Sequence, residues 1–313
     1  MLKAENVTKT YNAGKKLALE DFSIHVPEGS IYGLLGPNGA GKTTFIRIIN
    51  QITQADSGEV SINNQQLNPE HIRQIGYMPE ERGLYKNMTV GDQLLYFGEL
   101  KGMTKKDALK EAKYWFEQLE IDQWWKKKLS ELSKGMAQKI QFVVTVLHRP
   151  KLLILDEPFS GFDPVNANLI KDQILNLKEN GTTIILSTHR MESVEEMCDY
   201  VALINQSRKV LDGKVFDVRE QFKKNIFNVT LADVDQERFA QFNHQFEIHN
   251  QTTQNQLVSF DLKNDSDQNL LLNELLKVGR IRSFDEKIPS MNEVFINAVS
   301  GTEKPALSLK SEQ

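Results

Sequence analysis

A glycine-rich run carries the strongest chemical signal in this sequence. It lies between an apolar run at 31–35 and a helical pattern at 42–50, and it fits the spacing G-x-x-x-x-G-K-T. Glycines let backbone amides close around phosphate oxygens, and the following helix N-terminus adds positive potential. We expect Lys42 to reach the β and γ phosphates of a nucleotide and Thr43 to hold Mg²⁺. The residues predicted to bind the nucleotide in this run are Gly36, Pro37, Asn38, Gly39, Ala40, Gly41, Lys42, Thr43 and Thr44.

Two adjacent acids form the second signal. Asp156 and Glu157 follow four consecutive aliphatic residues at 152–155. Such a run predicts a central strand covered on both faces, and sheets of this kind bind ligands at the carboxyl ends of their strands. We expect Asp156 to bind Mg²⁺, directly or through water, and Glu157 to orient and deprotonate an attacking water as the catalytic base. The phosphate-binding loop and the two acids occur in kinases, GTPases and ATPases alike, so they do not decide among these classes of enzyme.

A third segment narrows the choice among these classes. Residues 132–139, Leu-Ser-Lys-Gly-Met-Ala-Gln-Lys, resemble the LSGGQ-type signature of ABC ATPases, with Lys134 and Met136 in place of the commoner residues. A Ser and a Gly that open a helix offer a hydroxyl, amides and a dipole to an anion. In that family the anion is the γ-phosphate bound by the other subunit. The resemblance therefore assigns Ser133, Gly135 and Gln138 to nucleotide binding.

Three further matches support the resemblance. The run 160–163, Ser-Gly-Phe-Asp, is similar to the family's D-loop, which crosses the dimer interface and includes Asp163. His189 follows a predicted strand, where the family has its catalytic switch histidine, and Tyr11 stands where an aromatic ring stacks on adenine. The resemblance covers residues 1 to about 217. It implies an ATP-hydrolysing P-loop domain with a mixed sheet core, a β-subdomain and a helical subdomain at about 84–150.

The resemblance also implies partners. In the family, two ATPase subunits bind two ATP molecules head to tail, and their closing performs mechanical work. The helical subdomain receives the coupling helix of a membrane-spanning permease, which here would be a separate chain. We expect most aromatic side chains between 84 and 129 to lie in the core, because helical spacing of aromatics favours packing, and a few exposed rings to contact that partner. Whether the two ATPase subunits are identical stays open.

Glu80 is a departure from the family pattern. It stands in the run Pro-Glu-Glu-Arg-Gly-Leu-Tyr at 79–85, where the family has a glutamine that touches Mg²⁺. A carboxylate there could also ligate Mg²⁺, although it adds like charge near Glu157 in a partly dry site. The run is similar to that of ABC-2 type exporters, including sodium and drug efflux types, so we interpret Glu80 as a subfamily trait.

The elements that must position these residues follow an α/β pattern up to about residue 217. From about 224 onward the pattern changes to short alternating runs and helices in the order βαββαβ, followed by a helix that begins at a capping box of Ser290 and Glu293. We therefore predict a nucleotide-binding domain at 1–217, a small ferredoxin-like α+β accessory domain at 218–300 and a flexible tail at 301–313. In the second domain we expect strands at 227–231, 246–248, 257–262 and 281–284.

Composition supports an intracellular location. The 313 residues carry 38 Lys and Arg against 42 Asp and Glu, a net charge of −4, which disfavours a nucleic-acid-binding chain. No run approaches the roughly 20 apolar residues that span a bilayer. The single cysteine, Cys198, allows no internal disulfide and fits a reducing cytosol. We expect a cytoplasmic protein that is peripheral on the inner face of the cell membrane.

Two other classes of protein share the phosphate-binding loop with exporter ATPases. A soluble ABC-type mechanoenzyme acting on nucleic acid or ribosomes usually has a long coiled-coil insertion or two nucleotide domains, whereas one phosphate loop and no long heptad insertion occur here. A P-loop kinase or GTPase would leave the 132–138 run unexplained, and the sequence has no Asn-Lys-x-Asp guanine motif.

Overall fold

The computed structural model describes residues 1–12, 14–81, 83–265 and 267–300. They form two compact units, one ending at Phe216 and one beginning at Asp217. The predicted tail at 301–313 lies outside the described residues. Among the described helices, none combines the length and the apolar character that a bilayer crossing requires.

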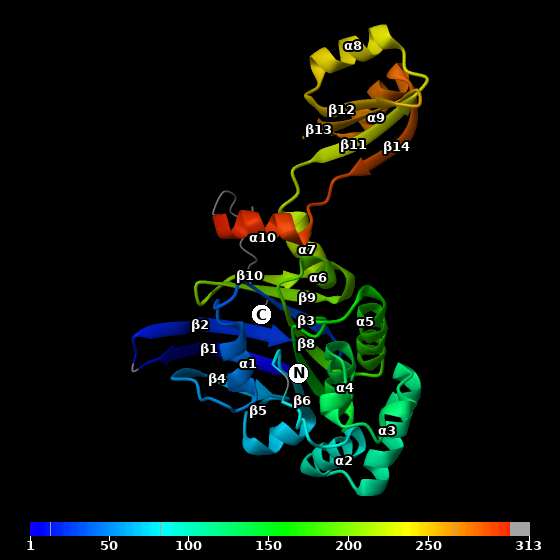
Figure 1. The fold of residues 1–313 in the computed structure, drawn as a ribbon. Coiled ribbons are helices and arrows are strands. Elements are labelled where there is room, and N and C mark those ends of the chain that lie inside the picture. The colour runs from blue at the N-terminus through cyan, green and yellow to red at the C-terminus, as the bar shows by residue number, and fades with distance from the viewer. Residues whose placement is uncertain (13, 82, 266, 301–313) are drawn as a thin grey trace. The chain divides into compact units, whose positions relative to one another are not determined.

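The first unit is built on a six-stranded sheet in the order β10-β9-β3-β8-β7-β6 (Figure 1). The pairs from β9 to β6 are parallel, and β10 joins the edge antiparallel to β9, so the sheet is mixed as predicted. All residues of the two strands at 31–35 and 152–156 are buried, which explains their unbroken apolar runs. The strands are β3 (Ile31–Leu35), β6 (Ile75–Met78), β7 (Leu152–Asp156), β8 (Thr183–Thr188), β9 (Tyr200–Asn205) and β10 (Arg208–Lys214).

A second, antiparallel sheet forms the predicted β-subdomain, in the order β2-β1-β4-β5. Its apolar face shares one core with helix α1 and the central sheet, where the rings of Phe22 and Phe45 meet edge to face at 4.8 Å. This shared core fixes the glycine-rich loop, because α1 begins at the end of that loop. The strands are β1 (Leu2–Tyr11), β2 (Lys16–Val26), β4 (Ser57–Ile62) and β5 (Gln65–Gln66).

Helices of the first unit begin where side chains cap them. Thr89, Thr104, Ser133 and Asp163 each accept a hydrogen bond from a backbone amide of the first turn. Ser133 therefore starts its helix at Lys134. The helices are α1 (Lys42–Ile49), α2 (Val90–Leu100), α3 (Lys105–Leu119), α4 (Lys134–Val146), α5 (Pro164–Glu179) and α6 (Met191–Met197), with 3₁₀ turns at Pro69–Gln74, Asp122–Trp124 and Leu129–Glu131.

The second unit has the predicted ferredoxin-like arrangement. Its four strands are antiparallel in the order β12-β13-β11-β14, and apolar side chains of α8 and α9 share a core with the sheet. The capping box is present, since Ser290 Oγ accepts from Glu293 N and Glu293 Oε2 accepts from Ser290 N. The elements are α7 (Val215–Gln221), β11 (Ile226–Ala232), α8 (Gln236–Gln245), β12 (Ile248–Gln254), β13 (Leu257–Lys263), α9 (Gln268–Val278), β14 (Arg280–Glu286) and α10 (Met291–Ser300).

Two local expectations in this region were incomplete. The second strand runs over 248–254 instead of 246–248, because it is an edge strand whose residues after Ile248 are polar and exposed, so no apolar alternation marks it. The helix at 215–221, which bridges the boundary between the units, was not predicted.

Candidate active site

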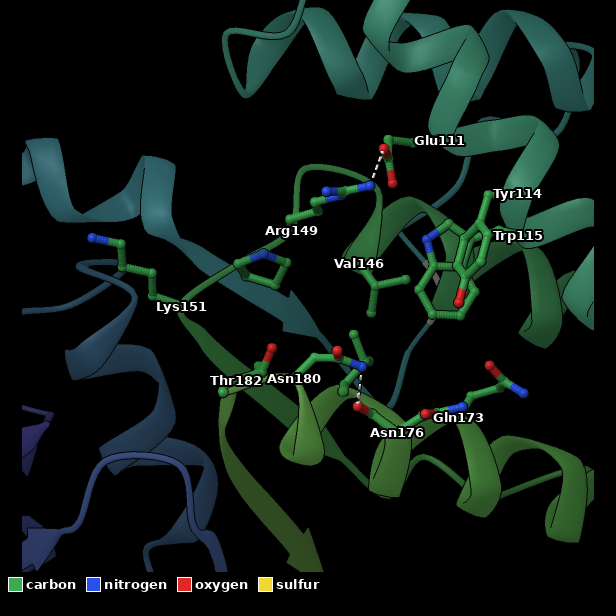
Figure 2. Close-up of a pocket in the computed structure, with 13 residues that line it drawn as sticks. Glu111, Tyr114, Trp115, Val146, Arg149, Lys151, Gln173, Asn176, Asn180 and Thr182 are labelled. Carbon is green, nitrogen blue, oxygen red and sulfur yellow. Dashed lines mark hydrogen bonds and ion pairs between the residues drawn. The ribbon is translucent and has the colours of Figure 1, made fainter.

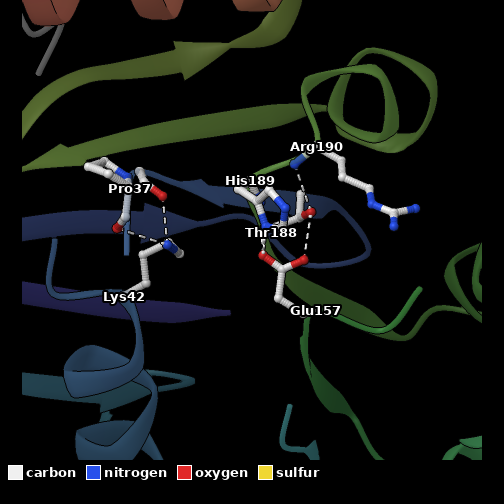
Figure 3. A network of polar contacts seen from close by, with 7 residues as sticks. Pro37, Lys42, Glu157, Thr188, His189 and Arg190 are labelled. Carbon is white, nitrogen blue, oxygen red and sulfur yellow. Dashed lines mark hydrogen bonds and ion pairs between the residues drawn. The ribbon is translucent and has the colours of Figure 1, made fainter. Parts of the chain in front are cut away.

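The glycine-rich loop joins β3 to α1 in a conformation that needs its glycines. Gly36 and Gly41 have φ angles of +148° and +124°, and a Cβ on Gly36 would lie 2.1 Å from the Ile204 carbonyl oxygen. Lys42 is 7% exposed and donates to the carbonyl oxygens of Gly36, at 2.6 Å, and Pro37, at 3.2 Å (Figure 3). The ammonium group is therefore held inside the loop by contacts that a phosphate could replace.

The charge of Lys42 interacts with the charges of three acids. Burial lowers the pKa of Lys42, whereas Glu157, Asp156 and Glu80 oppose that decrease. One pocket brings these groups together with Tyr11 from the end of β1, and Gly36, Pro37 and Ala40 shape the loop behind it. The pocket is lined by Tyr11, Lys16, Ala18, Asn38, Gly39, Gly41, Lys42, Thr43, Thr44, Glu80, Asp156 and Glu157.

Asp156 is a buried carboxylate, 4% exposed, at the carboxyl end of β7. Burial raises its pKa, Glu80 and Glu157 raise it further, and Lys42 opposes them. Ser187 lies opposite Asp156 in β8, and its hydroxyl also lowers the pKa of Asp156. That hydroxyl does not reach hydrogen-bond geometry with Asp156 or with any other group among the described residues. The site thus holds negative charge that its own residues do not fully neutralise.

The Glu157 side chain is tied to the segment that follows β8. Its Oε1 accepts from His189 N at 2.9 Å and lies 2.6 Å from His189 Nδ1, and its Oε2 accepts from Thr188 Oγ1 at 3.2 Å (Figure 3). The Glu157 backbone is left-handed, with φ of 50°, and its amide donates to Ser187 O at 2.9 Å. Such a conformation persists where surrounding contacts fix it, and this occurs often at functional sites.

The donor set fits a magnesium ion that arrives with a nucleotide. Thr43, Glu80 and Asp156 line one pocket and offer oxygen ligands, which Mg²⁺ prefers. Within the described part of the chain, no group of three or more His, Cys, Asp or Glu could hold a metal ion. Because Mg²⁺ is usually bound by one or two carboxylates together with substrate phosphates, these residues suit an ion whose ligand set the nucleotide completes.

The signature-like segment does not line this pocket. Ser133 caps α4 by accepting from Met136 N at 3.3 Å, and a Cβ on Gly135 would lie 3.6 Å from Gly161 O in the D-loop-like run. Gln138 is 2% exposed, and its amide donates to Pro158 O at 3.5 Å. The predicted contacts of these residues with a nucleotide held by a second subunit stay predictions.

Asp163 also lies outside the nucleotide pocket. It caps α5 by accepting from Asn166 N at 3.0 Å. It is the last residue of the D-loop-like run, and its predicted contact across a dimer interface stays a prediction.

A larger pocket lies elsewhere in the first unit. It encloses about 530 Å³ and is lined from α3, the turn after α4 and the end of α5, with an ion pair between Glu111 and Arg149 at 2.7 Å (Figure 2). It shares no residue with the glycine-rich loop or the acids. Volume alone would therefore have misplaced the active site.

Sequence reasoning missed several residues of the site. Lys16 and Ala18 line the pocket because β2 pairs with β1 beside Tyr11, a register that no local motif reveals. Thr188 contacts Glu157, and its only sequence signal is its position before His189 at the end of a predicted strand.

Comparison with known proteins matches both units. The family described as "ABC transporter" matches residues 19–160, and "ATP-binding protein DrrA1-3-like, C-terminal domain" matches residues 213–299. The uncharacterized ABC transporter ATP-binding protein YhaQ of Bacillus subtilis (strain 168) is 41% identical over 299 residues, which are 96% of this chain and 98% of YhaQ. The linearmycin resistance ATP-binding protein LnrL of the same strain is 36% identical over 221 residues, 70% of each chain.

A solved structure of the ATP binding subunit of an ABC transporter resembles the first unit. The TM-score is 0.66 with 29% sequence identity, and the match covers 71% of this chain and 93% of that one. The fold around the candidate site is therefore that of an ABC ATPase.

Proposed function

Because the chain belongs to the family of ABC transporter ATP-binding proteins, we propose that it is the ATPase subunit of an exporter whose permease is a separate chain. Two relatives support this assignment, since YhaQ, an ABC transporter ATP-binding protein, matches nearly the whole chain, and LnrL is named as a linearmycin resistance ATP-binding protein. We assign residues 1–217 to nucleotide binding, with a helical subdomain at about 84–150, and residues 218–300 to an accessory domain.

The arrangement around Glu157 is the observation that carries the chemical assignment. ATP binds in the glycine-rich loop, where Lys42 exchanges its two carbonyl contacts for the β and γ phosphates, and Tyr11 stacks on adenine. Glu157 orients a water and takes its proton, while the water oxygen bonds to the γ-phosphorus and the bond to the ADP oxygen breaks. His189 holds Glu157 in place and faces the γ-phosphate.

Magnesium would be held by Thr43, Asp156 and Glu80 together with the phosphates, and it would neutralise charge that develops on them. Its positive charge would also offset the unfavourable burial of Asp156 described above. The protein itself supplies the orientation of Glu157 and the fixed position of Lys42.

A second ATPase subunit completes each site in the proposed mechanism. Its Ser133 and Gly135, at the start of α4, would contact the γ-phosphate, with Gln138 supporting that helix and Asp163 at the dimer interface. The proposal holds for a second subunit that is identical to this chain and for one that differs from it. Closing of the dimer would drive the permease. We therefore propose that the chain works in the cytoplasm at the inner face of the membrane, and we expect no nucleic acid among its partners.

Exposed rings of the helical subdomain form the proposed contact with the permease. Tyr85 and Tyr96 are 51% and 39% exposed, and their rings meet at 5.8 Å beside Phe97. Buried rings such as Trp115 and Phe116 belong to the core. Exposed aromatic pairs of this kind are typical anchors of protein interfaces.

Substitution of Glu157 by Gln tests the chemical assignment. We expect ATP binding to persist, turnover to fall by roughly 10²- to 10⁴-fold, and an ATP-bound dimer to accumulate. Phosphate release and size-exclusion chromatography measure these effects, and Glu179→Gln, at the exposed end of α5, is the matched control. Hydrolysis at the wild-type rate in Glu157→Gln would remove Glu157 as the base.

Co-purification from membranes tests the transporter assignment. The chain should emerge from detergent extraction in a complex with a permease, and Tyr85→Ala combined with Tyr96→Ala should release it while leaving ATP binding intact. Tyr114→Ala, an exposed ring outside this pair, is the control and should keep the complex. Recovery of the wild-type chain without any membrane subunit would contradict the assignment.

A further inference from the structure

The two oxygens of the Glu157 carboxylate have unequal partners. Oε1 faces two nitrogens of His189, at 2.9 and 2.6 Å, whereas Oε2 has the single longer contact with Thr188 Oγ1, at 3.2 Å (Figure 3). A carboxylate oxygen can accept two hydrogen bonds. Oε2 is therefore the oxygen with free capacity for a further donor such as a water.

The Thr188 hydroxyl has a defined direction. Thr188 is fully buried, and its Oγ1 accepts from Arg190 N at 3.0 Å. A hydroxyl has one proton and two lone pairs. Since the Arg190 amide donates to Oγ1 and uses none of its donor capacity, the Thr188 proton is available for Glu157 Oε2, the acceptor at 3.2 Å. The hydroxyl thus links Oε2, the less constrained oxygen of the carboxylate, to the backbone of the segment after β8.

We propose that Thr188 is a positioning residue for ATP hydrolysis, which orients Glu157 Oε2 to receive the proton of the attacking water. This inference rests on the proposed role of Glu157 as the base. Glu157 has a left-handed backbone just after the end of β7, and its carboxylate is held by contacts with the segment after β8. His189 fixes one oxygen, and Thr188 fixes the other.

The test compares Thr188→Val, which keeps the shape and removes the hydroxyl, with Thr188→Ser, which keeps the hydroxyl. We expect Thr188→Val to lower kcat about tenfold, since a hydrogen bond to a charged group is lost, and to leave KM for ATP within about twofold. Thr188→Ser should retain kcat within about threefold. Thermal denaturation of each variant reports stability separately, and Thr188→Ala repeats the hydroxyl removal if the valine variant does not fold.

Thr183→Val is the matched control. Thr183 is also fully buried in β8, and its hydroxyl oxygen accepts from Gly29 N at 2.9 Å, away from the acids. Its variant should lose stability without losing kcat. An equal fall of kcat in Thr183→Val, or equal losses in the valine and serine variants at 188, would overturn the inference in favour of a purely structural role.

A double substitution separates this inference from the proposed function. If Glu157 is the base and Thr188 acts through it, Glu157→Gln with Thr188→Val should lose no more activity than Glu157→Gln alone. Full activity of Glu157→Gln would refute the base itself, whereas an inactive Glu157→Gln with a fully active Thr188→Val would refute only the role of Thr188.

Discussion

Each unit buries an aspartate in its sheet, and the surroundings of the two carboxylates are opposite. Asp261, in β13 of the second unit, is 5% exposed and accepts hydrogen bonds from Asn228, Asn250 and Lys287 at 2.8–3.1 Å. Burial acts to raise its pKa, but these donors outweigh burial and lower it to about 2. The negative charge of Asp261 is therefore satisfied by donors of the protein itself.

Asp156 in the first unit is equally buried, yet its pKa is raised, because burial and the neighbouring acids outweigh Lys42. A buried charge without sufficient partners costs stability and persists where a ligand needs it. Burial alone therefore does not distinguish a functional acid from a structural one. The distinguishing feature is whether the protein's own donors and cations satisfy the charge of the buried carboxylate.

The largest expected effect comes from Asp156→Asn. We expect kcat to fall by roughly 100-fold or more, because a ligand for Mg²⁺ is weakened, while the ligand-free protein gains stability as a buried charge is removed. Phosphate release and thermal denaturation without nucleotide measure the two effects. A loss of stability in Asp156→Asn would instead show that the ligand-free protein satisfies this carboxylate, as it satisfies that of Asp261.

Asp261→Asn should show the reverse pattern. The change removes the negative charge paired with Lys287 and replaces one acceptor oxygen by an NH2 group that faces other donors, so the second unit should lose about 1–3 kcal/mol of unfolding free energy, while ATP hydrolysis stays unchanged. Chemical denaturation and phosphate release distinguish the outcomes. A fall in kcat at unchanged stability would assign Asp261 a function instead.

Glu80→Gln should have a smaller effect on activity. It removes one of the acids near Asp156, so we expect a change of about two- to fivefold in ATPase rate and a shift in the Mg²⁺ concentration that supports half-maximal rate. A titration with Mg²⁺ in both proteins measures this shift. An unchanged Mg²⁺ dependence would exclude Glu80 as a ligand.

The pH dependence of stability gives the smallest effect. Because the folded pKa of Asp261 lies at about 2, below its ordinary value of 3.8, its stabilising contribution is complete above about pH 4 and is lost as the pH falls towards 2. The raised pKa of Asp156 acts with the opposite sign, so protonation of Asp156 relieves a cost.

Thermal denaturation between pH 5 and 2 checks these signs. Asp261→Asn should lose less stability than the wild type over this interval. Equal losses in the two proteins would contradict the contribution of Asp261.

Residues that act through a local motif were predictable from the sequence. The loop ending at Lys42 and the acids after the aliphatic run fall in one pocket, since strand ends in a parallel sheet meet at one edge. The order of elements in the second unit likewise predicted its sheet. Thr188 and Lys16 could not be found in this way, because their roles depend on partners across strands. The polar edge strand at 248–254 lacked the apolar alternation that marks a strand.

The position of β3 in the sheet has a consequence for biosynthesis. This strand, which carries the glycine-rich loop, ends at Leu35, whereas its two neighbours begin at Thr183 and Tyr200. At about 5–20 residues per second, a ribosome needs roughly 7–30 seconds to bring β8 to its place beside β3. During that time β3, which is fully buried in the folded protein, has no sheet partner, so an incomplete chain lacks the ATP site and exposes a strand that favours aggregation.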